Sequence, residues 1–478
     1  MGDYSNRLFP QLERCMHMKI NVATKQPPVY THEGGRATPA PNAAVDLRRA
    51  VMACLLWEDQ FYESGIAIAD RIKDLVSKVP AEVVANFAIK AREEMKLRHV
   101  PLLLVREMAR GPVAHRLLVG KTLAAVIQRA DELSEFLAIY WKDGRQPLSA
   151  QVKKGLAAAF PKFSEYALAK YNRDGAVKLR DALFLSHAKP ADALPRPYTK
   201  AERKAERDGE IKPFPLTPGE RRFKALVDGE LATPDTWEVE LSGGADKRAT
   251  FERLIAEDKL GALALLRNLR GMQEAGVPVV VIEGALAKID TTRVLPHRFI
   301  AAARAAPALE HMLEAPMLKC AAELPKLAGR TLLLIDVSGS MDERLSGKSD
   351  MTRLDAACGL AIIARELCEQ VAVLTFSNTI AQVPARRGFA LRDAIVQSQQ
   401  HGGTYLGAAI EKANAFEYDR IIVITDEQSA DQVGAPRGRG YMLNVASNKN
   451  GVGYGPWNKI DGFSEAVIRY VAEAETAQ

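Results

Sequence analysis

The sequence LLLIDVSGSM, residues 332–341, places four consecutive large apolar residues directly before an aspartate, two serines and a glycine. A short, continuous apolar run is typical of a strand that is buried on both faces of a parallel sheet. The carboxylate and hydroxyl oxygens that follow it are hard ligands of the kind that Mg²⁺ prefers. The stretch therefore predicts a buried strand whose carboxyl end leads into a metal-binding loop.

The last third of the chain repeats this pattern. Three further apolar runs follow: QVAVLTFSN at 370–378, RIIVITDEQ at 420–428 and YMLNVAS at 441–447. Between them, residues 353–369 and 404–416 place apolar side chains at helical spacing. Alternating strands and helices predict a doubly wound α/β domain with a Rossmann-like sheet, which we expect to span residues 330–478.

The carboxyl ends of these strands carry the candidate metal ligands, because ligands bind beyond that edge of such a sheet. The candidates are Asp336, Ser338 and Ser340 after the first strand, Thr404 in the loop GGTYLG, and Asp426 after the strand IIVIT. We expect these five side chains to meet and to bind a divalent metal, Mg²⁺. The alternative is that they only cap helices and turns.

No sequence pattern of an enzyme competes with this interpretation. The chain has no Ser/His/Asp order on a nucleophile elbow and no H-E-x-x-H motif. The GKT at 120–122 lacks the upstream glycine of a P-loop, since His115 stands at that position. We therefore expect a protein that binds its ligands and is not an enzyme.

The region from about residue 45 to 190 predicts one helix after another. Apolar residues recur at helical spacing, with short Pro or Gly breaks, in 47–59, 65–79, 81–95 and 119–141. Stacked pairs of such helices indicate a HEAT-like solenoid. Helical spacing returns at 249–276 and 297–313, so we expect an all-helical domain over residues 1–329. Residues 190–235 begin with a Pro-rich, charged stretch and are expected to form a loop insertion.

Positive charge is concentrated in the helical region. Residues 1–329 contain 50 Lys and Arg against 41 Asp and Glu, whereas residues 330–478 contain 15 against 18. Within the helical part, residues 151–200 contain 10 basic and 4 acidic side chains. Such an excess suggests a polyanionic partner, and a solvated charged face is the alternative.

Two basic stretches supply candidate RNA contacts, because Lys and Arg neutralise phosphates and an aromatic ring can stack on an unpaired base. The first stretch, 168–190, contributes Lys170, Tyr171, Arg173, Lys178, Arg180, His187 and Lys189. The second, LLRNLRGM, contributes Arg267, Asn268 and Arg270 on an otherwise apolar helix, where an arginine needs an acidic neighbour or a phosphate. An ordinary solvated surface remains the alternative for the first stretch.

Several of these motifs together resemble a known family. VIQRADELSEFLAIYWK, LFLSHAKP, KLGALALLRNLRGM, LPHRFIAAA and LLLIDVSGSM occur in the order seen in the Ro autoantigen family, the TROVE-module ribonucleoproteins, which have bacterial orthologues. The spacing Asp336-x-Ser338-x-Ser340, then Thr404, then Asp426, resembles the metal-ion-dependent adhesion site of von Willebrand factor A domains. The first 40 residues are less similar to the family, and residues 190–235 do not align with it.

The resemblance implies a ring of HEAT-like helices closed by the A domain, with a central hole. It implies a noncatalytic RNA-binding scaffold that holds Y-like small noncoding RNA on its outer basic surface, through Lys170, Tyr171, Arg173, His187 and Lys189. Single-stranded 3′ ends of misfolded RNA are expected in the hole, with Arg267, Asn268 and Arg270 as candidate contacts. In bacteria, the Y RNA is expected to tether the protein to polynucleotide phosphorylase for RNA quality control.

A second hypothesis is a metal-dependent protein-interaction module, in which the A domain captures an acidic residue of a partner and the helices are a scaffold. A nuclease is a more distant third. Five scattered cysteines predict reduced thiols, and no apolar run approaches the roughly 20 residues of a membrane helix. We expect a monomer in the cytoplasm that does not bind membranes.

Overall fold

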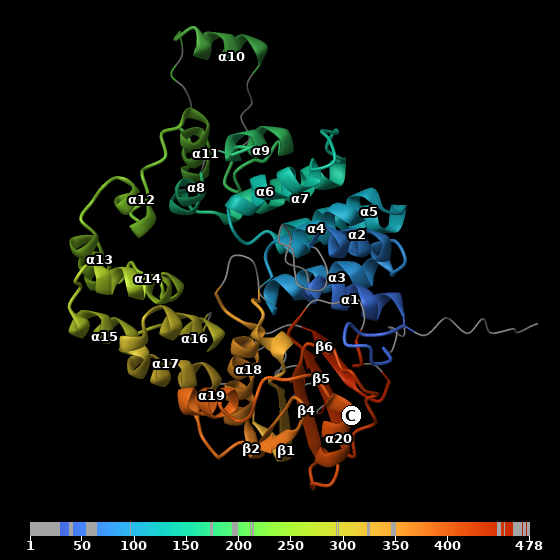
Figure 1. Ribbon diagram of the computed structural model, residues 1–478. Helices are drawn as coiled ribbons and strands as arrows, with labels where there is room; N and C mark the ends of the chain where they lie inside the picture. The colour runs from blue at the N-terminus through green and yellow to red at the C-terminus, as the bar shows by residue number, and fades with distance from the viewer. Residues whose placement is uncertain are drawn as a thin grey trace, which may run out of the picture.

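The structure is a computed structural model of the 478-residue chain. It describes residues 29–37, 42–53, 65–95, 97–172, 175–193, 199–210, 212, 215–292, 294, 296–322, 326–345, 350–446, 451–453, 455–461, 471 and 475. Its elements follow one another around a ring that begins at α1 and is completed by the sheet domain (Figure 1).

The first half of the ring is a stack of short helices that pack against their neighbours. They are α1 (Ala43–Ala53), α2 (Gly65–Val76), α3 (Ala81–Glu93), α4 (His99–Arg110), α5 (Val113–Val126), α6 (Asp131–Tyr140), α7 (Ala150–Ala159), α8 (Glu165–Tyr171) and α9 (Leu179–Ser186). Successive helices such as α3, α4 and α5 contact one another in pairs, as expected for a HEAT-like stack.

The region expected to be a loop insertion contains helices. After α10 (Lys200–Arg207), which stands away from the ring in Figure 1, α11 (Pro218–Asp228) packs on α8 and α9. A capping box between Thr217 and Glu220 begins α11, and Phe223 and Leu226 are buried. The expectation of a loop over 190–235 was therefore wrong at α11, because the apolar face of this short helix lies among charged neighbours in the sequence.

The second half of the ring continues from α11 to the sheet domain. It consists of α12 (Trp237–Ser242), α13 (Lys247–Ala256), α14 (Ala262–Glu274), α15 (Val279–Ala287), α16 (Pro296–Ala305) and α17 (Glu310–Ala322). In Figure 1 these helices descend on the left side of the view and reach the sheet domain at α16 and α17.

The C-terminal part is a six-stranded sheet in the order β3-β2-β1-β4-β5-β6. The strands are β1 (Leu327–Asp336), β2 (Cys368–Phe376), β3 (Ile380–Gln382), β4 (Arg420–Thr425), β5 (Arg439–Asn444) and β6 (Asn458–Asp461). All described pairs are parallel except β2 with β3. Helices α18 (Arg353–Leu367) and α19 (Gly388–Val396) contribute to the core on one face, and α20 (Leu406–Ala413) to that on the other. The predicted doubly wound α/β fold is confirmed.

Apolar packing does not divide the chain at residue 329. One core cluster extends from Leu47 to Leu226, and a second joins α13–α17 to α18, α19 and one face of the sheet. The second cluster includes Phe251 and Leu313 from the helices together with Leu333 and Ile335 from β1. The change from one core to the next therefore falls between residues 226 and 251.

The N-terminal segment closes the ring against the sheet domain. The Thr31 hydroxyl and the Gly35 N–H both donate to the carbonyl oxygen of Ser429, at 2.8 and 3.1 Å. Helix α1 packs against β6, and Arg49 of α1 forms a buried ion pair of 3.4 Å with Glu427. In the part of the chain that the structure describes, no helix is both long and apolar enough to cross a membrane.

Candidate metal site and nucleic-acid interface

Three loops at the carboxyl edge of the sheet bring the predicted metal ligands together. Strands β1 and β4 are parallel neighbours, so Asp336 and Asp426 follow adjacent strand ends. The Gly339 N–H donates to the carbonyl oxygen of Gly402 at 2.9 Å, and the Ala430 N–H donates to that of Thr404 at 2.8 Å. Both carboxylates, Ser338 and Thr404 are buried, and Ser340 is half-buried.

The first carboxylate is held by its own loop and by the neighbouring strand. Asp336 accepts from the Ser338 N–H at 2.9 Å and from the Thr425 hydroxyl at 2.6 Å. Burial and then the charge of Asp426 raise the pKa of Asp336 to about 7. Two carboxylates buried this close together need a cation or a proton nearby.

A guanidinium that the sequence analysis did not single out meets the second carboxylate. Arg353, in the first turn of α18, lies 3.2 Å from Asp426 through its Nη1 atom and donates to the carbonyl oxygen of Ser340 at 3.1 Å. The hydroxyls of Ser338 and Ser340 lie 3.3 Å apart. Carboxylate and hydroxyl oxygens are the ligand types that a hard divalent ion prefers. Arg353 already neutralises part of the negative charge of the two carboxylates. Among the described residues, no group of three or more His, Cys, Asp or Glu side chains is placed so that it could hold a metal ion.

Glu427 connects this loop to the ring closure. Its backbone has a φ of 61°, an uncommon conformation for a residue other than glycine, and its side chain is fully buried. The carboxylate pairs with Arg49 of α1 and with Lys459 of β6, and it accepts from the Gly453 N–H. The residue that follows a candidate metal ligand thus holds the two ends of the ring together.

The first part of the predicted RNA surface lies on α8 and is partly packed. Lys170 is half-buried, with its Nζ atom 6.0 Å from the ring centre of Tyr166 and 5.9 Å from that of Tyr171. The guanidinium of Arg129 covers the Tyr171 ring at 4.6 Å. Tyr171 therefore already has a cation on its ring, and Arg173 lies outside the described residues.

The other predicted outer contacts are exposed around α9: Lys178, Arg180, His187 and Lys189. His187 ends the helix in the left-handed conformation, with a φ of 55°. Phe184, which the sequence analysis did not select, has 58% of its surface exposed among these cations. Its position four residues after Arg180, on the same helix face, was the signal available in the sequence.

The candidate contacts for the hole lie on α14. Arg267 and Arg270 are exposed, and Arg270 lies 3.7 Å from Glu274. Asn268 donates to the carbonyl oxygen of Ala264, one turn earlier in its own helix, at 2.8 Å. The expectation that these arginines lie on a buried helix face and therefore need a partner was wrong, because the buried face of α14 carries Leu265, Leu266, Leu269 and Met272 instead.

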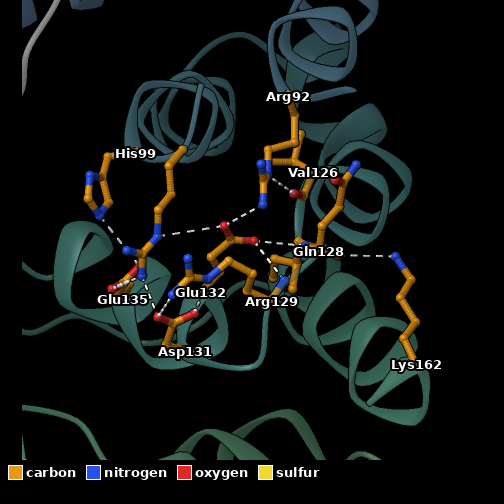
Figure 2. Close-up of polar contacts among 11 residues, drawn as sticks. Arg92, His99, Val126, Gln128, Arg129, Asp131, Glu132, Glu135 and Lys162 are labelled. Carbon is orange, nitrogen blue, oxygen red and sulfur yellow. Dashed lines mark hydrogen bonds and ion pairs between the residues drawn. The ribbon is translucent and has the colours of Figure 1, made fainter. Parts of the chain in front are cut away.

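A buried ionic cluster where α3, α4 and α6 meet was not predicted (Figure 2). The fully buried Glu132 accepts from Arg92 at 2.7 Å and from the N–H groups of Gln128 and Arg129 at 2.8 and 3.0 Å. Arg98 bridges Asp131 and Glu135, each at 2.5 Å. Most of these charges are paired within the cluster, which therefore has a structural role at the bend of the stack.

The comparisons with known proteins agree with this architecture. Residues 193–323 match the family model of the TROVE domain, and residues 331–428 match that of the von Willebrand factor type A domain. The chain is thus a two-domain protein in which a helical TROVE region is followed by a von Willebrand factor A domain. This pair of matches, in this order, agrees with the predicted resemblance to the Ro family.

A solved structure with the same fold is the crystal structure of the Ro (RSR) protein of Deinococcus radiodurans. The two chains are 20% identical, and the match covers 90% of this chain and 100% of the other, with a TM-score of 0.59. The helical ring and the A domain therefore share the overall arrangement of that Ro protein.

Proposed function

We propose that the chain is a noncatalytic RNA-binding scaffold of the Ro type. The single observation that carries the proposal is the group of exposed cations around α9, on a ring that contains a TROVE domain. Side chains of this kind contact phosphates without reading the base sequence. A small structured RNA, such as a Y-like RNA, is the ligand proposed for this surface.

The test is the salt dependence of binding to a small hairpin RNA. Each phosphate contact contributes about 0.7–0.9 to the slope of log affinity against log salt concentration. Replacing Lys178 and Arg180 together by Glu is expected to weaken RNA binding. The magnitude of the slope is expected to fall by the contribution of about two phosphate contacts. The control replaces Arg386 and Lys412 by Glu, since both are exposed on the A domain and the charge change is equal. A flat salt response of the unchanged protein, or equal losses in both variants, would contradict the proposal.

We further propose that the ring accepts single-stranded 3′ ends of misfolded RNA and passes such RNA to a 3′ exonuclease such as polynucleotide phosphorylase. Support comes from the ring arrangement and from the exposed Arg267 and Arg270 on α14. A hairpin with a 3′ tail is expected to bind more tightly than the same hairpin with a blunt end. Labelled RNA that is incubated with Mg²⁺ and the purified protein alone is expected to stay intact, and cleavage that copurifies with the protein would contradict a noncatalytic role.

The proposed metal is Mg²⁺, held by the hydroxyls of Ser338, Ser340 and Thr404 together with Asp336 and Asp426. When bound, the ion would offer an open position to an oxygen ligand of a partner. A metal-dependent protein-interaction module is therefore the second candidate function, favoured by the convergence of these buried oxygens. Asp336→Ala separates the two, because loss of partner capture with RNA binding intact would favour the second function. We also propose that the protein acts as a monomer in the cytoplasm, which is compatible with both functions.

A further inference from the structure

One loop carries both a candidate metal ligand and the contacts that close the ring. Asp426 directly follows β4, and the next three residues, 427–429, contact the N-terminal part of the chain. Residues 425–429 are all buried. Close packing leaves a buried loop of this kind no free space, so one residue cannot shift without its neighbours. The metal ion and the closing contacts would therefore act on the same short piece of backbone.

The loop is hydrogen bonded to the N-terminal segment at two residues. The side-chain oxygen of Gln428 accepts from the His32 N–H at 2.5 Å. The carbonyl oxygen of Ser429 accepts from the Thr31 hydroxyl at 2.8 Å and from the Gly35 N–H at 3.1 Å. Loss of the N-terminal segment from its place would thus leave three acceptor contacts of the loop unmade.

The N-terminal segment, residues 29–37, is the weaker partner in this contact. Most of its residues are exposed, and Ala37 is its only buried apolar side chain. Segments with few buried apolar contacts open locally at a lower free energy than the core of a protein. The segment can therefore leave the loop while the helices of the ring stay folded.

On its other side, the same loop supports two of the candidate metal ligands. The Gln428 N–H donates to the Asp426 carboxylate at 3.3 Å. The Ala430 N–H donates to the carbonyl oxygen of Thr404 at 2.8 Å. Release of the loop by the N-terminal segment would loosen both ligands, which come from different parts of the chain. An ion that needs both would bind the closed ring more tightly, and such a ligand shifts the equilibrium towards closure.

Glu427 gives a second connection between the ion and the closure. Its φ of 61° is uncommon for a residue other than glycine, and such a conformation persists only where surrounding contacts impose it. These contacts come from Arg49 of α1 at 3.4 Å, from Lys459 and from the Gly453 N–H. Separation of α1 from the sheet domain would therefore let the backbone beside Asp426 relax.

We propose that binding of a divalent ion at the metal site and closure of the ring by the N-terminal segment are coupled. The ion stabilises the closed ring, and closure in turn strengthens binding of the ion. The inference rests on the proposed metal site and does not depend on RNA binding. Such a coupling typically changes an equilibrium by about 5- to 150-fold. The factor is the same for both effects, because linkage between two binding equilibria is reciprocal.

Hydrogen exchange of the full chain, read by mass spectrometry, measures the effect of the ion on closure. Saturating Mg²⁺ is expected to slow amide exchange in residues 29–37 by about 5-fold or more, relative to NaCl of equal ionic strength. Ser338→Ala removes a predicted ligand that lies outside the loop. At the same Mg²⁺ concentration, this variant is expected to lose most of the slowing at 29–37.

Calorimetric titration of the full chain with MgCl₂ measures the effect of closure on the ion. Gly35→Ala places a Cβ atom against the carbonyl oxygen of Ser429 and is expected to weaken Mg²⁺ binding. By reciprocity, the loss cannot exceed the factor by which the ion slows exchange at 29–37 in the unchanged protein. Thr31→Val, which removes only one hydroxyl donor, is expected to act in the same direction by a smaller factor. Gly271→Ala is the control, because a Cβ there meets open space, and it is expected to keep the affinity of the unchanged protein.

Two kinds of failure are distinguishable. If Mg²⁺ binds but leaves exchange at 29–37 unchanged, or if Gly35→Ala and Thr31→Val bind it as tightly as Gly271→Ala, the coupling is overturned while the metal site stands. If the unchanged protein does not bind Mg²⁺ at all, the proposed metal site is overturned and the coupling with it.

Discussion

Glu132 is a carboxylate in the core of the helical stack. It is fully buried, and burial raises the pKa of its carboxyl against the opposing effects of the Gln128 N–H and Arg92. Burial likewise lowers the pKa of Arg92. Each charge of the pair is therefore stable in the core only because the other is present.

Glu132→Ala is expected to lower the free energy of unfolding by about 3–5 kcal/mol, because it leaves Arg92 buried without its counter-ion. Urea unfolding followed by helical circular dichroism measures the change. The control is Glu94→Ala, which removes an exposed ion pair with Lys90 and is expected to cost less than about 1 kcal/mol. Similar losses in the two variants would show that the buried cluster is not structural.

Asp235 provides a pH-dependent contribution to stability. Hydrogen bonds from Arg253 and Lys259 hold the pKa of this carboxyl well below its ordinary value of 3.8. A carboxyl whose pKa is lower in the folded state stabilises the protein above its unfolded pKa, and this contribution is lost as pH falls toward the folded value. The difference in Tm between the unchanged protein and Asp235→Asn is expected to be constant from pH 7 to 5 and to shrink below about pH 4. A difference that does not depend on pH would contradict this assignment.

At the scale of elements, the strands and the candidate metal residues could be predicted from the sequence, whereas several partners could not. The runs that become β1, β2, β4 and β5 are mostly apolar because both faces of the sheet are covered. Parallel pairing then brings Asp336 and Asp426 to one edge. Arg353 escaped prediction because its contact with Asp426 spans 73 residues and depends on the orientation of α18.

In the helical region, too, the contacts between elements could not be predicted from the sequence. The signal for α11 was present in Thr217-Pro218-Gly219-Glu220, a helix start with a capping box, but the charged flanks masked it. Tyr171 has the residue type of a stacking platform, and only the structure shows that Arg129 covers it and that Tyr166 is the exposed ring. Local patterns predict which face of a helix is apolar, but not which neighbour covers it.

A substitution at Gly35 can test whether the N-terminal segment closes the ring. A Cβ atom at this position would overlap the carbonyl oxygen of Ser429, with which the Gly35 N–H is hydrogen bonded. Gly35→Ala is expected to weaken this contact by about 1–3 kcal/mol and to speed amide exchange in residues 29–37. Hydrogen exchange read by mass spectrometry measures it. Gly271→Ala is the control, because a Cβ there meets open space, and it is expected to leave exchange at 29–37 unchanged. Unchanged exchange in Gly35→Ala would show that the segment does not close the ring.

At the scale of the whole molecule, the family boundary and the physical boundary differ. The TROVE match ends at residue 323, and the A-domain match begins at residue 331. The second core nevertheless contains buried residues from both sides of this boundary. Ion pairs also cross it: Arg392 of α19 pairs with Glu310 of α17 at 2.8 Å, and Arg304 of α16 pairs with Asp355 of α18. Helices α16 and α17 are therefore expected to unfold together with the A domain.

This difference predicts how the chain behaves when it is cut. A fragment of residues 330–478 loses α16, α17 and the 3-10 turn between them (Pro307–Leu309). It therefore loses the buried Leu309, Leu313 and Met317, which share one core with α18 and α19, and each such side chain contributes about 1.5–3 kcal/mol. A fragment of residues 232–478 keeps that core whole. We expect the shorter fragment to melt more than about 10 °C below the longer one, because 1 kcal/mol corresponds to about 2–4 °C in domains of this size. Calorimetry of the two fragments measures the difference, and equal melting temperatures would place the physical boundary at residue 329 after all.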